Sequence, residues 1–128
     1  GRPPGAGGSQ AWDVSADGSV VVGDAPLAGD IVPTIWNEGQ GMRNLVDSLV
    51  ELGLGPAMAG WNLEQAIAVS ADGLTVTGWG YNPAGDEEAW VAHLGQPSLV
   101  EIPTASNAAL ALFAALLVVA GLVALRLR

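Results

Sequence analysis

The chain has 128 residues, no cysteine, and thirteen carboxylates against four basic side chains, which gives a net charge of −9. This balance excludes nucleic acid as a partner, because binding a phosphate backbone requires clustered lysine or arginine. The missing thiols exclude disulfides, cysteine nucleophiles and Cys-based zinc or iron–sulfur sites.

Residues 1–10, "GRPPGAGGSQ", contain two prolines and four glycines and show no apolar periodicity. Such a composition predicts a disordered N-terminal stretch. The stretch contains neither an initiator methionine nor an apolar leader. We therefore expect the chain to be a fragment of a longer protein, in which upstream repeats of the same chain are partners of this region.

The stretch "AWDVSADGSVVVGD" returns as "AIAVSADGLTVTGW" 55 residues later, with eight of fourteen positions identical. In both copies an Asp-Gly pair, Asp17-Gly18 and Asp72-Gly73, precedes a run of β-branched residues. Asp-Gly tolerates the positive φ that a tight turn needs, and β-branched residues favour strands. The repeat therefore predicts one β-hairpin used twice, with these four residues in its turns.

Each hairpin is followed by a Gly-rich connection and an aromatic strand that reaches Trp36 in the first copy and Trp90 in the second. These tryptophans are expected to pack in the core. Between the copies, "NLVDSLVELGLG" places leucines at helical spacing, which predicts a short helix over 44–52. The predicted β-repeat region is 11–94, with units at about 11–43 and 66–94.

The sequence of this region resembles the HAF-type extracellular repeats of bacterial surface and secreted proteins. The resemblance is carried by the doubled V-S-A-D-G and by "GWNLEQAIAVSADGLTVTGWGYNPAGDEEAWVAHL". It implies a mainly β fold of repeated antiparallel hairpins in a partial propeller-like array, with the short helix added. It transfers no catalytic residues.

Residues 95–107 are predicted to be a linker, and residues 108–125 contain no charged or polar side chain. As a helix this segment would be about 27 Å long, close to the hydrocarbon core of a bilayer, so it predicts a transmembrane helix with membrane lipid as its partner. Arg126 and Arg128, in the tail 126–128, follow the span directly. By the positive-inside rule the tail is cytoplasmic and the acidic body lies outside. A buried core helix is the alternative for this segment.

The order of a short proline motif, an apolar span and terminal arginines resembles the PEP-CTERM class of sorting signals, in its I-P-T-L-S variety. Ile102, Pro103, Thr104 and Ser106 match the motif, and Ala105 replaces its leucine. The resemblance implies recognition, and cleavage near the motif, by a membrane-embedded exosortase. A permanent single-pass anchor is the alternative that the residues leave open.

The residues do not form a catalytic pattern: there is no nucleophile elbow around a serine and no phosphate-binding loop. The acidic loops do not have the alternating carboxylates of a calcium site, so we expect no metal and no cofactor. The missing patterns predict a non-catalytic protein, and the two resemblances imply that it is exported to the bacterial cell surface or extracellular matrix. The alternatives are a permanently anchored binding receptor and a secreted hydrolase whose active site lies upstream.

Overall fold

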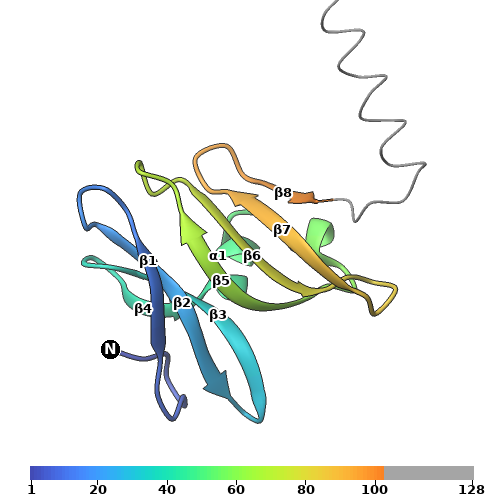
Figure 1. The fold of residues 1–128 in the computed structure, drawn as a ribbon, viewed down its shortest axis with the longest axis horizontal. Coiled ribbons are helices and arrows are strands. Elements are labelled where there is room, and N and C mark those ends of the chain that lie inside the picture. Colours follow the sequence, from blue (N-terminus) through green and yellow to red (C-terminus); the bar gives the residue numbers. More distant parts are fainter. Residues whose placement is uncertain (103–128) are drawn as a thin grey trace, which may run out of the picture.

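The computed structural model describes residues 1–102, which form two four-stranded antiparallel sheets with one short α-helix and one 3₁₀ turn, η1 Pro56–Met58 (Figure 1). Sheet 1 consists of β1 Gln10–Val14, β2 Val20–Leu27, β3 Asp30–Asn37 and β4 Gly41–Asn44. Sheet 2 consists of β5 Asn62–Val69, β6 Thr75–Tyr81, β7 Glu87–His93 and β8 Ser98–Glu101. In both sheets, strands that follow one another in the chain are neighbours. The mainly β fold predicted from the sequence is confirmed.

The two sheets have the same strand order and the same pairing at the repeated motif. Val14 pairs with Val21 in sheet 1, and Val69 pairs with Val76 in sheet 2, so the offset of 55 residues holds on both strands. The second sheet extends beyond the end predicted for the second unit. β8 lies inside the segment expected to be a linker, where it pairs with β7.

The strand register shows that Trp36 and Trp90 do not occupy equivalent positions in the two sheets. Trp90 pairs with Gly78, whereas in sheet 1 the residue that pairs with Gly23 is Thr34. Trp36 lies two residues further along β3 because the connections before the two strands differ in length. Of the two tryptophans expected to pack in the core, Trp90 is fully buried, whereas Trp36 is only half-buried.

The short helix predicted from the leucine spacing is α1, Leu45–Glu51. Its N-cap is Asn44, whose side chain accepts a hydrogen bond from the Val46 N–H at 2.9 Å. The helix ends at Glu51, with Leu52 as its C-cap. The next residue, Gly53, has a φ of +86°, which glycine adopts without strain, and its N–H donates to the Val50 carbonyl at 2.9 Å. These local signals therefore set both ends of the helix.

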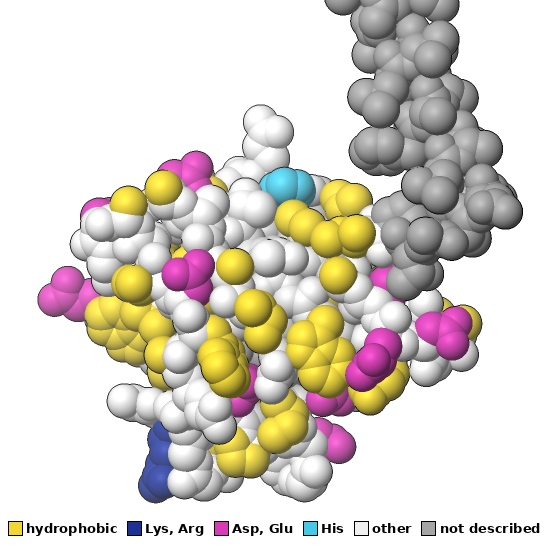
Figure 2. Space-filling model, viewed as in Figure 1, with side chains coloured by type: hydrophobic (Ala, Val, Ile, Leu, Met, Phe, Trp, Pro, Cys, Tyr) yellow, Lys and Arg dark blue, Asp and Glu magenta, His cyan; other side chains and the backbone are white. Residues whose placement is uncertain are grey.

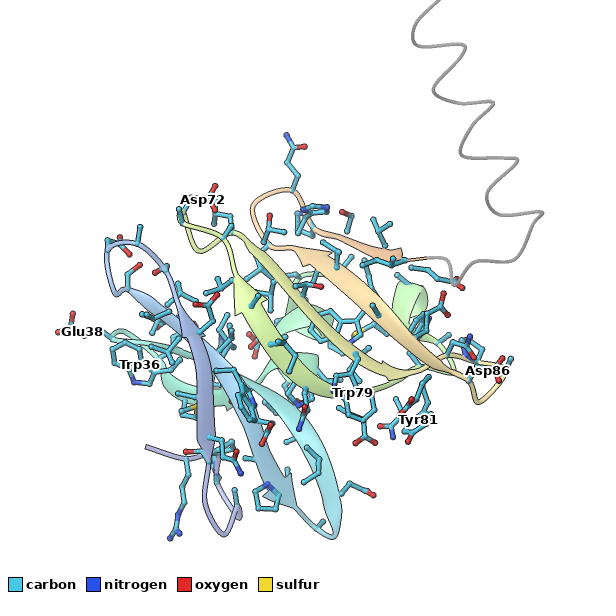
Figure 3. All side chains as sticks on the ribbon, in the orientation of Figure 1. Trp36, Glu38, Asp72, Trp79, Tyr81 and Asp86 are labelled. Atoms are coloured by element: carbon cyan, nitrogen blue, oxygen red, sulfur yellow. The ribbon has the colours of Figure 1, made fainter. Side chains whose placement is uncertain are left out.

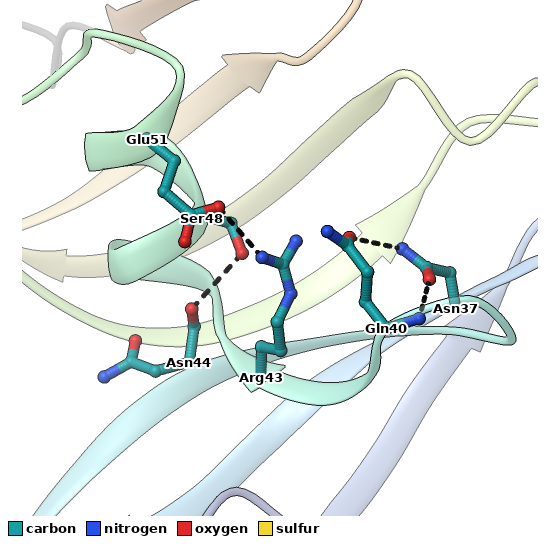
Figure 4. A network of polar contacts seen from close by, with 6 residues as sticks. All are labelled: Asn37, Gln40, Arg43, Asn44, Ser48 and Glu51. Atoms are coloured by element: carbon teal, nitrogen blue, oxygen red, sulfur yellow. Dashed lines mark hydrogen bonds and ion pairs between the residues drawn. The ribbon is translucent and has the colours of Figure 1, made fainter.

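Polar contacts hold α1 against β4 (Figure 4). Arg43 donates to the Glu51 carboxylate at 3.0 Å, and Ser48 donates from Oγ to the Asn44 carbonyl at 3.4 Å. Because the Glu51 side chain is largely exposed, the ion pair contributes little to stability and mainly orients the helix.

The core lies between the two sheets and is completed by α1 and η1 (Figure 1). For each sheet we call the face that carries Val21 or Val76 its front, and the opposite face its back. The back of sheet 1 packs on the front of sheet 2, with β5 next to β1, β2 and β3. The buried core consists of Val22, Ile35, Leu45, Leu49, Leu54, Met58, Leu63, Ala66, Val76, Trp90 and Ala92.

Residues 1–9, expected to belong to a disordered stretch, pack on the front of sheet 1. Pro3 and Ala6 are buried, and the segment lies beside Leu27 and Met42. Burial of these small apolar side chains accounts for the difference from the expectation. We call residues 1–9 the N-terminal cover.

No helix within residues 1–102 is long and apolar enough to cross a bilayer. The predicted transmembrane helix 108–125 and the basic tail 126–128 lie outside the described residues.

Candidate interaction site at the repeated turns

The first repeated turn is closed by its own serine and aspartate. Ser15 Oγ accepts from the Val20 N–H at 3.0 Å and donates to Asp17 Oδ1 at 2.9 Å. Asp17 Oδ1 also accepts from Ser19, from N–H at 3.0 Å and from Oγ at 2.7 Å. Gly18 has φ +75°, which supplies the positive backbone angle predicted for this turn. The S-A-D-G motif thus specifies a turn through its own side chains.

The second turn repeats this arrangement almost atom for atom. Ser70 Oγ accepts from the Thr75 N–H at 3.0 Å and donates to Asp72 Oδ1. Asp72 Oδ1 accepts from the Leu74 N–H at 3.0 Å, and Gly73 has φ +74°. The one difference is that Leu74 stands where the first turn has a serine, so one hydroxyl donor is lost.

These bonds stabilise the charged form of both aspartates. The Ser19 hydroxyl and N–H, together with the Ser15 hydroxyl, lower the pKa of Asp17 from 3.8 to about 2. The pKa of Asp72 is also lowered, chiefly by the Ser70 hydroxyl and then by the Leu74 N–H. Because each carboxylate accepts hydrogen bonds from its own turn, its negative charge stabilises that turn.

Replacing Asp17 with alanine is expected to lower the thermal midpoint at neutral pH, by an amount that shrinks as the pH falls from about 4 towards 2. The folded pKa lies below the ordinary value, so the contribution of Asp17 is present above pH 4 and is lost as the carboxylate is protonated. Thermal unfolding of both proteins across this range measures the effect. Ser19→Ala, which removes the largest cause of the shift, should move the loss to higher pH. A midpoint difference that stays constant with pH contradicts the assignment.

The two turns meet at one end of the molecule, and this contact links the sheets. The Ala16 N–H in the first turn donates to the Ala71 carbonyl in the second at 3.0 Å. A Cβ placed on Gly73 would lie 2.8 Å from Val20 Cγ2, so the second turn fits closely against β2. Figure 3 shows Asp72 in this turn, at the opposite end of sheet 2 from Asp86.

Asp13 adds a second hydrogen bond across the sheets, from the Val69 N–H to Asp13 Oδ2 at 2.8 Å. This N–H, followed by the Val14 N–H, lowers the pKa of Asp13. The role of Asp13 was missed from the sequence. The sequence contains one signal for it: the second copy has Ala68 at the equivalent position. A residue needed to form the turn would recur in both copies, so an aspartate present in only one copy points to a different role.

Of the predicted sorting motif, Ile102 lies within the described residues. Its N–H donates to the Ala89 carbonyl at 3.2 Å, and its side chain is 41% exposed. The predicted motif therefore begins directly after β8, which ends at Glu101. Pro103, Thr104, Ser106, Arg126 and Arg128 lie outside the described residues.

Two groups of titratable side chains lie outside the repeated turns. Glu88 is buried and accepts from Asn82 Nδ2 at 2.8 Å, and a hydrogen bond to Glu88 raises the pKa of Glu101, with burial and charge repulsion adding to the shift. His93 Nδ1 lies 3.2 Å from Thr75 Oγ1 beside a shallow hollow of about 540 Å³, and no other hydrogen bond orients this ring within residues 1–102.

Within the same residues, no three His, Cys, Asp or Glu side chains are grouped so that they could hold a metal ion. No protein-family model matches the chain, and no curated protein matches it in sequence.

Proposed function

We propose that this chain is a non-catalytic repeat module of the bacterial cell surface or extracellular matrix that ends in a membrane-spanning sorting signal. The observation that carries the proposal is the use made of the repeated motif. Its serine and aspartate side chains close the turns, and its backbone joins one sheet to the next. A motif used for turn formation and stacking is typical of a structural array.

The module belongs to a propeller-like array of HAF type, in which upstream repeats of the same chain continue the stacking. Two arguments support this: the two sheets share strand order and turn chemistry, and their sequence resembles those repeats. Stacked repeats bury apolar faces that a single repeat would leave exposed, so arrays of three or more units are favoured.

The C-terminal segment 108–128 targets the module to the cell envelope. The apolar run 108–125 is long enough to span a bilayer, and Arg126 and Arg128 keep its end in the cytoplasm. The body, with its thirteen carboxylates, then faces outward. An exosortase-type enzyme recognises the segment that begins at Ile102 and cleaves near it, which releases the module to the extracellular space.

Intact-mass spectrometry of the protein from the membrane and secreted fractions of its native host tests this function. A carboxyl terminus between residues 102 and 107 in the secreted fraction is the expected result. Pro103→Ala should leave the uncleaved chain in the membrane, whereas Pro97→Ala, five residues before the motif, should be processed normally. An intact Arg128 in wild-type protein contradicts processing and favours the permanently anchored receptor.

A further inference from the structure

Within residues 1–102, the packing of sheet 1 on sheet 2 leaves one copy of each contacting surface without an equivalent partner. The back of sheet 1 is covered by the front of sheet 2. Because the sheets are copies of one unit, the back of sheet 2 is equivalent to a packed face, and so is the front of sheet 1. We propose that a second copy of this 128-residue chain docks its sheet 1 front on the sheet 2 back, repeating the packing seen within one chain. On the sheet 1 front the docked copy takes the place that an upstream repeat takes in a longer array.

The backbone hydrogen bonds of the two turns likewise leave one donor and one acceptor without a partner within the described residues. The Ala16 N–H donates to the Ala71 carbonyl, but the equivalent donor, the Ala71 N–H, and the equivalent acceptor, the Ala16 carbonyl, have no hydrogen bond within residues 1–102. Both residues are exposed at the same end of the molecule. A second copy whose sheet 1 packs on sheet 2 as sheet 2 packs on sheet 1 within the chain brings its Ala16 carbonyl to this Ala71 N–H.

Side chains on the back of sheet 2 suit this contact. Thr75 is equivalent to Val20, so it meets Gly18 of the second copy as Val20 meets Gly73 within the chain. Val91 and Val100 lie side by side on this face, and Val100 is 47% exposed. Figure 2 shows hydrophobic side chains spread over the visible side of the molecule, with carboxylates scattered among them.

The front of sheet 1 is partly occupied by the N-terminal cover, which the second copy displaces. The hydrogen bonds of the cover join its own residues, for example Ala6 N–H to the Pro3 carbonyl and Ser9 Oγ to the Gly1 carbonyl. Within residues 1–102 the cover is therefore held to the sheet by packing alone. Thr34 Oγ1, on the covered face, is buried and has no hydrogen-bond partner among the described residues.

The two docking faces differ, so the association is head-to-tail and copies can add at both ends. Since both partners carry the acidic body, their mutual repulsion opposes docking and is screened by salt over a Debye length of about 8 Å at physiological ionic strength. Docking is therefore stronger at 0.3 M than at 0.02 M sodium chloride. This inference concerns contacts between chains, so it stands or falls separately from cleavage of the tail.

Cross-linking between single-cysteine variants of the full chain in a nonionic detergent tests the proposal, because the natural chain has no cysteine. Ala16→Cys and Ala71→Cys proteins are mixed and treated with a short bismaleimide. The expected yield of heterodimer is several-fold above that of a matched mixture of Ala16→Cys with Ala84→Cys, an exposed alanine in the β6–β7 turn. Equal yields show random or tail-driven collision and overturn the proposal.

Thr75→Arg provides an internal control because docking uses different faces of the two chains. In the Ala71→Cys chain, which offers its sheet 2 back, the arginine should remove the excess yield. In the Ala16→Cys chain, which offers its sheet 1 front, it should have no effect. A similar loss in both chains, or in neither, contradicts head-to-tail docking, and the circular dichroism of both variants verifies that they are folded.

Discussion

Replacing Gly78 with alanine is expected to destabilise the protein by about 3 kcal/mol, the upper end of the usual range for overpacking, because the site has no room for a methyl group. A Cβ at this position would lie 1.8 Å from the Gln65 carbonyl oxygen and 2.6 Å from Trp90 Cζ2. The first contact is with the backbone of the neighbouring strand and the second with a fully buried ring, so neither can easily move.

Urea unfolding of the full chain, followed by circular dichroism, measures this loss as a lower midpoint at an unchanged slope. Gly7→Ala is the matched control: a Cβ there meets nothing within 4 Å, and Gly7 does not have a positive φ. Its midpoint should stay close to that of the wild type. Equal midpoints for the two variants would show that β5 and Trp90 do not lie against Gly78.

Replacing Trp90 with alanine is expected to cost about 3–5 kcal/mol, as is typical for truncating a large buried aromatic side chain. Trp90 is fully buried on the front of sheet 2 and belongs to the cluster that joins the two sheets. Its Nε1 has no hydrogen-bond partner within residues 1–102, so Trp90→Phe loses volume but no hydrogen bond. The phenylalanine variant should therefore recover much of the stability.

Trp36→Ala is the control for this pair of variants, because Trp36 is only half-buried on the front of sheet 1. It should cost clearly less than Trp90→Ala in the same urea experiment. If the two alanine variants lost equal stability, the tryptophans would be equivalent, as their positions in the sequence suggested, and the register found here would be contradicted.

The features that could be predicted from the sequence are those set by neighbouring residues. The Asp17-Gly18 and Asp72-Gly73 turns follow from serine and aspartate side chains that bond their own backbone. The helix follows from its leucine spacing and from Asn44 at its start. In both cases the interacting groups lie within a few residues of one another.

The features that could not be predicted depend on how separate segments meet. Trp36 and Trp90 look equivalent in the sequence, but they occupy different positions in their sheets. The β2–β3 and β6–β7 connections differ in length, which shifts a residue along its strand, and the motif does not show how each connection sets the register. β8 lies in a segment with linker composition, and it becomes a strand by pairing with β7. The candidate site likewise depends on the offset between sheets, which brings Asp13 to the Val69 N–H.

Stacking of the two repeats is the claim on which both proposals depend, and amide hydrogen exchange at Ala16 and Ala71 tests it most directly. The two alanines occupy the same position of the same turn and are both exposed. Only the Ala16 N–H is hydrogen-bonded across the sheets, at 3.0 Å. In dilute protein at low salt, Ala16 should exchange at least about tenfold more slowly than Ala71. Equal exchange rates would mean that the turns do not meet, and would contradict the stacked arrangement.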